Sequence, residues 1–95
     1  PFLRTAAENG FAEAQGDLGY AYDVGEGVEK NEAVAVEWYR RAAEQDHTRA
    51  MYNLGQCYEH GTGVGSDPAT AVTWYQRAAD LGYLSAIYHL GECHE

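Results

Sequence analysis

The chain has 95 residues, which is enough for one compact unit near the lower end of ordinary domain sizes. Its formal net charge of −9 argues against nucleic acid and against an anionic membrane surface as partners, because both demand basic side chains. No stretch reaches the roughly 18 uninterrupted apolar residues of a membrane span. The acidic balance either favours a basic partner or simply keeps the chain in solution.

Taken in chain order, the first nine residues match the end of a later helix, because residues 6–8 (Ala-Ala-Glu) recur 36 residues on at 42–44. Gly10 follows them, at a place where a helix C-terminus favours a left-handed residue. A helix is predicted over residues 12–24 and is ended by the glycine-rich turn of residues 25–28. Asn31 is a candidate N-cap for a further helix that runs to about residue 45.

The same order of elements then returns. A helix is predicted over residues 48–60, where Gly61 stops it. Asp67 and Pro68 supply an N-cap followed by proline at the first helical position, where the missing N–H costs nothing. That helix is predicted to end at Gly82, and another begins near Leu84.

This recurrence is an internal repeat of 36 residues. Residues 11–46 align with residues 47–82 without a gap, and 15 of the 36 positions are identical, where chance would give roughly two or three. The sequence therefore predicts a single all-α repeat domain over residues 1–95. Its parts are the end of one repeat (1–10), two complete repeats (11–46 and 47–82) and the first helix of a truncated repeat (83–95).

Some of the repeated residues point to close packing. Gly19, Gly55 and Gly91 fall inside predicted helices, where glycine costs about 1 kcal/mol relative to alanine. We expect neighbouring backbones to approach too closely there for a side chain. Trp38 and Trp74 recur at helical spacing, which favours a packing role over ligand stacking.

The repeated pattern is that of a known family. It reads Ala-x3-Leu-Gly-x2-Tyr in the first helix, Gly-x-Gly-Val in the turn, and Ala-x4-Trp-Tyr-x2-Ala-Ala in the second helix. It resembles the Sel-one-like repeat, a relative of the tetratricopeptide repeat, over essentially the whole chain. The resemblance implies a right-handed α-solenoid of antiparallel helix pairs with a concave groove. It also implies an adaptor or scaffold for protein–protein interaction, with no catalytic activity and no cofactor.

In arrays of the tetratricopeptide type the first helix of each pair lines the groove. The resemblance therefore implies that three rows of equivalent positions face this groove, headed by Gly16, Tyr20 and Asp23. Tyrosines and carboxylates in these rows suit a basic or amphipathic peptide, although the rows can also be plain solvated positions. The candidate protein-binding residues are Tyr20, Asp23, Tyr52, Gln56, Glu59, Tyr88 and Glu92.

Cysteine and histidine also allow a zinc site to be considered. Zinc ligands use spacings like those of two groups in the chain, which are Cys57 with His60, and His89 with Cys93 and His94. However, the two cysteines lie one period apart at the same repeat position, which favours small buried apolar residues. We expect no metal, and also no disulfide, because equivalent positions on stacked helices lie farther apart than the roughly 7 Å that a disulfide spans.

The sequence shows no catalytic constellation, so we expect the protein not to be an enzyme. The glycine run 61–65 joins two helices and lacks the strand and Lys-Ser/Thr of a phosphate-binding loop. Many acidic residues are explained by surface ion pairs, such as Glu37 with Arg41.

The alternative to a groove-binding adaptor is a structural fragment of a longer scaffold, which self-associates through its ends. Apolar residues of the terminal elements would then be exposed. They are Phe2, Leu3, Leu84, Ile87 and Leu90.

Overall fold

A computed structural model of the chain describes residues 2–93, and the side chains of residues 4–91. Over this part the chain is helical, with no strand. The helices are α1 (Phe2–Glu8), α2 (Ala12–Val24), α3 (Glu32–Ala43), α4 (Thr48–His60), α5 (Pro68–Asp80) and α6 (Leu84–Cys93). The predicted all-α fold is confirmed, and the predicted ends of α2 and α4 agree with the observed ones to the residue.

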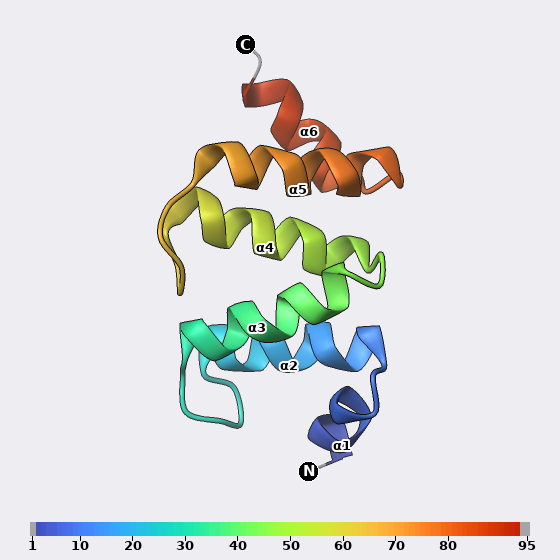
Figure 1. Ribbon diagram of the computed structural model, residues 1–95, viewed down its shortest axis with the longest axis vertical. Helices are drawn as coiled ribbons and strands as arrows, with labels where there is room; N and C mark the ends of the chain where they lie inside the picture. Colours follow the sequence, from blue (N-terminus) through green and yellow to red (C-terminus); the bar gives the residue numbers. More distant parts are fainter. Residues whose placement is uncertain (1, 94–95) are drawn as a thin grey trace.

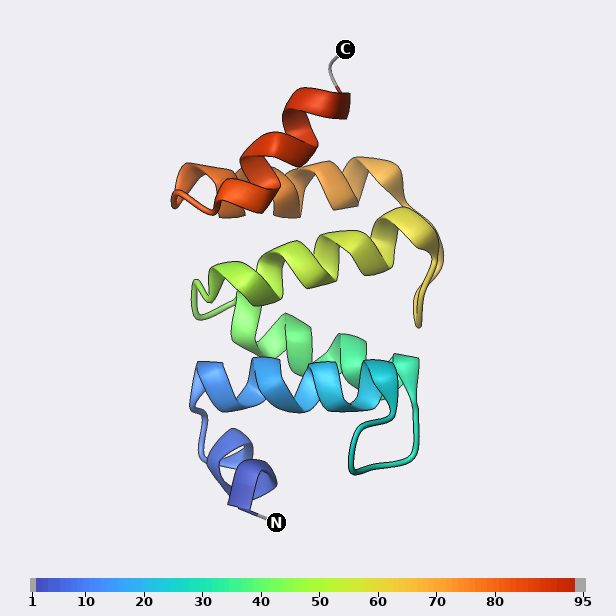
Figure 2. The ribbon, with the colours of Figure 1, turned by 180° about the vertical axis from the view of Figure 1, so that it is seen from behind.

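The helices stack one on another along the long axis of the molecule, with α1 at one end and α6 at the other (Figure 1). The resulting body measures 43 × 24 × 17 Å. Each helix packs mainly on the helices before and after it in the sequence. Seen from behind, α2, α4 and α6 lie on the near side, with α3 and α5 behind them (Figure 2). This arrangement is the predicted α-solenoid of antiparallel helix pairs, and no described helix is long and apolar enough to cross a membrane.

The two loops within the helix pairs are built alike, as their shared residues predict. Each begins at a glycine with a left-handed backbone, at φ 79° for Gly25 and φ 70° for Gly61. Each ends at an N-cap, Asn31 or Asp67, whose side-chain oxygen accepts a hydrogen bond at 3.2 Å from the backbone N–H three residues on. Both loops lie at the same edge of the stack (Figure 1).

Gly19 and Gly55 lie at the contact within their helix pairs, but the expected cause was wrong in its main part, and for Gly91 no close contact with a described atom is found. A Cβ at Gly19 would lie 2.7 Å from the ring of Tyr39, and a Cβ at Gly55 would lie 2.7 Å from the ring of Tyr75. The neighbour is therefore a buried ring of the second helix more than a backbone. The closest backbone approach lies elsewhere, at Gly63, where a side chain would run into the carbonyl of Glu32 at the start of α3.

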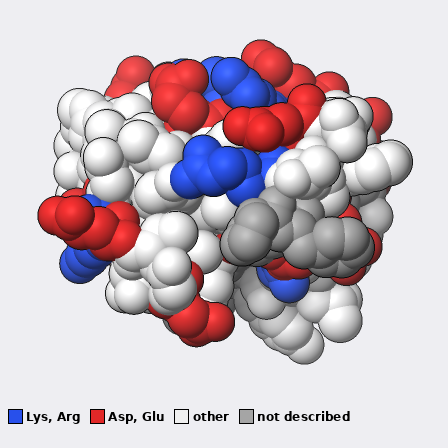
Figure 3. All heavy atoms as spheres, turned by 90° about the horizontal axis from the view of Figure 1, so that it is seen from below, with Lys and Arg blue, Asp and Glu red and all other residues white. Residues whose placement is uncertain are grey.

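The tryptophans pack as predicted, but the surface charges pair differently. Trp38 is buried among side chains of α1, α2 and α3, and the guanidinium of Arg41 covers its ring at 4.7 Å. The sequence predicted that Arg41 pairs with Glu37, and this prediction was wrong. Arg40 takes that place, at 3.2 Å. On the face at the α1 end, acidic side chains are spread along the edges with basic ones between them (Figure 3).

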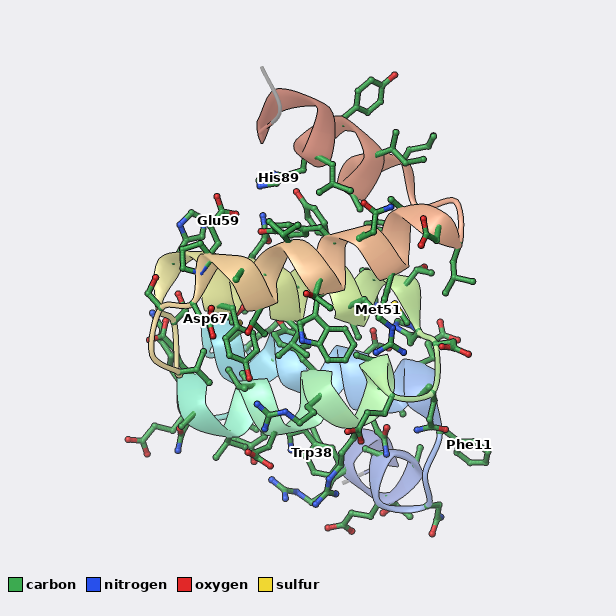
Figure 4. All side chains as sticks on the ribbon, turned by 45° about the horizontal axis from the view of Figure 1, so that its top comes forward. Phe11, Trp38, Met51, Glu59, Asp67 and His89 are labelled. Atoms are coloured by element: carbon green, nitrogen blue, oxygen red, sulfur yellow. The ribbon has the colours of Figure 1, made fainter. Side chains whose placement is uncertain are left out.

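The apolar residues expected to be exposed at the ends divide into two groups. On α6, Leu84 is 67% exposed and Ile87 is 44% exposed, as predicted. Leu90 is only 7% exposed, because it packs beside Tyr75 and Ala71 of α5, so the prediction for Leu90 was wrong. The side chains of Phe2 and Leu3 lie outside the described part. Phe11, between α1 and α2, is an unexpected exposed aromatic that points away from the ribbon (Figure 4).

Candidate functional site

Two adjoining hollows lie between α2 and α4, the first helices of the two complete repeats. The larger has a volume of about 460 Å³. Its lining residues are Asp17, Tyr20, Ala21, Glu26, Arg49, Tyr52, Asn53 and Tyr83. The smaller has a volume of about 270 Å³. Its lining residues are Asp23, Lys30, Glu32, Asn53, Gln56, Cys57, His60 and Thr62. Asn53 lines both, so the two hollows form one groove, called the α2–α4 groove below.

Helical spacing explains how these side chains reach the groove. On α2 the lining of the larger hollow comes from residues 17, 20 and 21, and on α4 from residues 49, 52 and 53. Both sets follow the i, i+3, i+4 spacing that places side chains on one face of a helix. Gly16 lies at the contact between the helices and not in the groove, since a Cβ there would be 3.2 Å from the His47 ring.

Four of the predicted site residues come together in this groove. Tyr20 and Tyr52 line its larger hollow, and Asp23 and Gln56 line its smaller one. The two tyrosines differ in exposure. Tyr20 is 51% exposed, whereas Tyr52 is half-buried and packs against three other rings.

The structure places the other three predicted residues away from the lining of the groove. Tyr88 is 73% exposed on α6. The carboxylate of Glu59 points to α5 and α6, where it accepts a hydrogen bond from the Tyr75 hydroxyl at 2.5 Å and lies 2.9 Å from Nε2 of His89 (Figure 4). The side chain of Glu92 lies outside the described part.

Glu59 therefore has a packing role that the sequence did not reveal. The hydrogen bond from Tyr75 lowers the pKa of the Glu59 carboxyl, and the charge of His89 acts in the same direction against a burial effect that raises it. Asp23 has the matching contact one repeat earlier, where its carboxylate accepts a hydrogen bond from Tyr39 at 3.1 Å. The bond makes each carboxylate part of the contact between the two helices of its own pair.

An aromatic cluster supports the floor of the larger hollow. The ring of Tyr52 lies 5.4 Å from that of Tyr75, 5.5 Å from that of Tyr83 and 6.0 Å from that of His89, measured between centroids. Rings at these distances and tilts attract one another. Tyr52 is thus held by packing, whereas Tyr20 forms a more open wall.

The charges in the larger hollow are acidic on balance. Arg49 supplies the cation, and its guanidinium lies 2.5 Å from the Asp17 carboxylate, so these two charges offset each other. Among the described side chains, Glu26 makes no ion pair. A ligand that enters the hollow therefore meets one uncompensated carboxylate beside three tyrosine rings.

Several lining residues were missed from the sequence. Asp17, Glu26, Arg49, Asn53 and Tyr83 line the larger hollow, but they fall between or beyond the three rows that were chosen. One feature of the sequence could have indicated some of these residues, namely a pair of opposite charges. Asp17 and Arg49 are 32 residues apart, one repeat less one helical turn, so they can meet across successive first helices.

The groove contains a thiol, but not in a reactive form. Burial raises the pKa of Cys57 to about 12, so the thiol is neutral at physiological pH. Among the described residues, no group of three or more histidines, cysteines, aspartates or glutamates is placed to hold a metal ion. The side chain of Cys93 lies outside that part of the chain. The groove offers aromatic rings, hydrogen-bonding groups and charged side chains.

Comparison with protein-family models gives two consecutive matches along the chain. The family model described as Sel1 repeat matches residues 12–47 and residues 48–83. A search of curated protein sequences gives no significant match.

Comparison with solved structures gives close likenesses. A Sel1 repeat protein from Oxalobacter formigenes is 43% identical with a TM-score of 0.93, over 95% of this chain and 68% of that one. The protective antigen c5321 of uropathogenic Escherichia coli, which displays an SLR fold, is 37% identical with a TM-score of 0.92, over 95% of this chain and 19% of that one. Cysteine rich protein B of Helicobacter pylori is 27% identical with a TM-score of 0.86, over 90% of this chain and 65% of that one.

Proposed function

The chain belongs to the Sel1 repeat family, and we propose that it is a non-catalytic interaction module that binds a peptide or protein segment in its α2–α4 groove. Sel1 repeat proteins are generally protein-interaction modules and typically non-catalytic scaffolds. The finer part of the proposal, that the segment is basic or amphipathic, rests on the groove itself.

The observation that carries the proposal is the lining of the larger hollow. Three tyrosines and a carboxylate that makes no ion pair with another described side chain line a space of about 460 Å³, which is within the usual size range of binding pockets. Tyrosine gives contact area and a hydrogen bond while few rotamers are frozen on binding. The net charge of −9 adds a long-range attraction for a basic segment.

The test is a selection of random 12-residue peptides displayed on phage, followed by calorimetry of the selected peptides. Tyr20→Ala is the most informative variant, because its ring is 51% exposed and its loss spares the core. Tyr52→Ala would not separate a loss of binding from a loss of stability, since that ring also belongs to the aromatic cluster. Phe11→Ala is the matched control, an aromatic that is 64% exposed and outside the groove.

We expect Tyr20→Ala to weaken peptide binding about tenfold, which is the effect of a central interface tyrosine, and Phe11→Ala to leave it unchanged. Equal affinity for wild type and Tyr20→Ala would place the site on another surface. Tyr88→Ala then tests whether the bound segment also reaches α6.

A second candidate function has its own observation. Leu84 and Ile87 expose apolar surface at the α6 end, which suits a scaffold fragment that packs against another copy of itself. Sedimentation equilibrium of wild type and of Leu84→Gln/Ile87→Gln measures this. A dimer in the wild type that the double variant abolishes would support the scaffold function, and a monomer at all concentrations would exclude self-association.

A further inference from the structure

We propose that the larger hollow of the α2–α4 groove is a socket for one arginine side chain of the bound segment. This inference rests on the proposed function, since it names the group that anchors the ligand. It goes further by assigning one chemical group, a guanidinium, to one place, between Tyr20, Tyr52 and Tyr83.

The walls of the hollow include three tyrosines, whose rings attract a cation. Tyr52 and Tyr83 lie 5.5 Å apart between centroids and are inclined at 47°, so their rings form a corner instead of a closed stack. Tyr20 lines the same hollow from α2. A cation within about 6 Å of a ring centroid is attracted by the ring, and the attraction is stronger when water is excluded.

The charges of the hollow favour the same ligand. Asp17 and Glu26 are acidic, and Arg49 already shares its charge with Asp17 at 2.5 Å. The carboxylate of Glu26 makes no ion pair with any other described side chain. A bound cation would compensate Glu26, whereas an acidic side chain would add a like charge beside it.

A guanidinium fits the hollow better than an ammonium. It is planar and weakly hydrated, so it can stack on a ring and donate hydrogen bonds to a carboxylate at the same time. The chain uses this chemistry internally, with Arg41 over Trp38 at 4.7 Å and Arg77 over Trp74 at 4.6 Å. Arg40 adds a hydrogen bond to the hydroxyl of Tyr58 at 2.7 Å.

The experiment titrates the 95-residue chain with three small probes and follows its NMR resonances. The probes are the N-acetyl methylamides of arginine, lysine and citrulline, the last being a neutral molecule of nearly the same shape as arginine. We expect the arginine probe to shift the ring resonances of Tyr20, Tyr52 and Tyr83 with a dissociation constant on the order of millimolar. Citrulline should bind about tenfold more weakly, and lysine about threefold more weakly, because each lacks part of the cation–π and hydrogen-bonding energy.

Two variants and a control locate the effect. Glu26→Gln should weaken arginine binding severalfold while it changes citrulline binding little, since only the charge is removed. Tyr20→Ala should weaken binding of arginine more than that of citrulline. Phe11→Ala should alter neither.

The outcomes separate this inference from the proposed function. Equal binding of arginine and citrulline, preference for lysine, or shifts confined to residues outside the hollow would each overturn the socket. The inference also fails alone if a selected peptide depends on Tyr20 yet keeps its affinity when its arginines are replaced by citrulline. If no peptide binds the groove, the proposed function fails, and the probe titration still decides whether the hollow takes a guanidinium.

Discussion

The helix pair α2–α3 and the helix pair α4–α5 contain the same repeated residues in different surroundings. Within each pair the repeated glycine and tyrosine make the same contact, since the ring of Tyr39 covers Gly19 as that of Tyr75 covers Gly55. Between pairs they differ. Val36 is 1% exposed in α3, whereas its equivalent Val72 is 41% exposed in α5.

This difference shows which residues define a repeat and which depend on its neighbours. Both α3 and α5 pack against the helix before and the helix after them. The neighbour after α3 is the 13-residue helix α4, whose following loop also reaches α3 at Gly63, whereas the described neighbour after α5 is the ten-residue helix α6. The same dependence appears in the loops. Gly63 lies against the backbone of α3, but its equivalent Gly27 has nothing within 4 Å. The glycine–tyrosine contact within a pair should therefore be similar in both copies, and the contacts between pairs should not.

The largest expected loss of stability comes from adding a methyl group at the glycine–tyrosine contact within a helix pair. Gly19→Ala should lower the free energy of unfolding by about 2 kcal/mol, because overpacking a buried ring costs up to about 3 kcal/mol and the helix gains about 1 kcal/mol from alanine. Gly91→Ala is the control, since Gly91 has the same place in its helix but a Cβ there would have no described atom within 4 Å. It should leave stability unchanged or raise it by up to about 1 kcal/mol. Urea denaturation measures both, and similar losses in the two variants would refute the assignment to the ring.

The next effect tests the contact between pairs. Val36→Ala should cost about 1.5 kcal/mol, because two methyl groups leave a fully covered site and the gain in helix propensity offsets only part of that loss. Val72→Ala should change the free energy of unfolding by less than about 0.5 kcal/mol, since its side chain is 41% exposed. Thermal unfolding of the two variants side by side is the measurement. Equal effects would mean that α5 is covered in solution, as self-association would require.

A third variant examines the carboxylate that joins α4 to α5. Tyr75→Phe removes the hydrogen bond to Glu59 and should cost about 1 kcal/mol at pH 7. Because the folded protein lowers the pKa of Glu59, the stabilisation exists above the usual glutamate pKa of about 4.3 and is lost as the pH falls through the lowered value. The wild type should therefore lose more stability than Tyr75→Phe between pH 7 and pH 3. Parallel pH profiles for the two proteins would contradict this role of Glu59.

The same comparison explains how far the sequence could predict the fold. Helix ends were predictable because local groups determine them, such as the left-handed glycine at Gly61 and the N-cap at Asp67. Burial at the ends was less predictable, because it depends on partners beyond the repeat. Leu90 is covered by α5 although Ile87, three residues earlier, is 44% exposed.

The candidate site was predictable in its helices but only partly in its residues. The assignment to the first helices followed from the family pattern, and Tyr20 and Tyr52 do line one hollow. Equivalent positions in one predicted row differ in burial. Gly16 is buried at the α2–α4 contact, whereas Tyr88 of the same row is 73% exposed. Helical spacing alone does not show where a neighbouring helix crosses, and that crossing decides which face remains open.

The smallest expected change in stability comes from Asp46, a turn residue that stands where the neighbouring repeats have glycine. Asp46 has a φ of 64°, a left-handed conformation that Gly10 and Gly82 occupy at the equivalent places. Asp46→Gly should relieve about 1 kcal/mol of strain, and it also removes the exposed ion pair with Arg77 at 3.6 Å, which contributes little. The net gain should be about 0.5 kcal/mol and should grow slightly in 1 M salt, where that pair is screened in the wild type. Asp46→Asn is the control, because it loses the charge but keeps a side chain that tolerates this backbone. Unfolding in urea with and without salt measures both, and a gain in Asp46→Asn equal to that in Asp46→Gly would assign the effect to charge and not to strain.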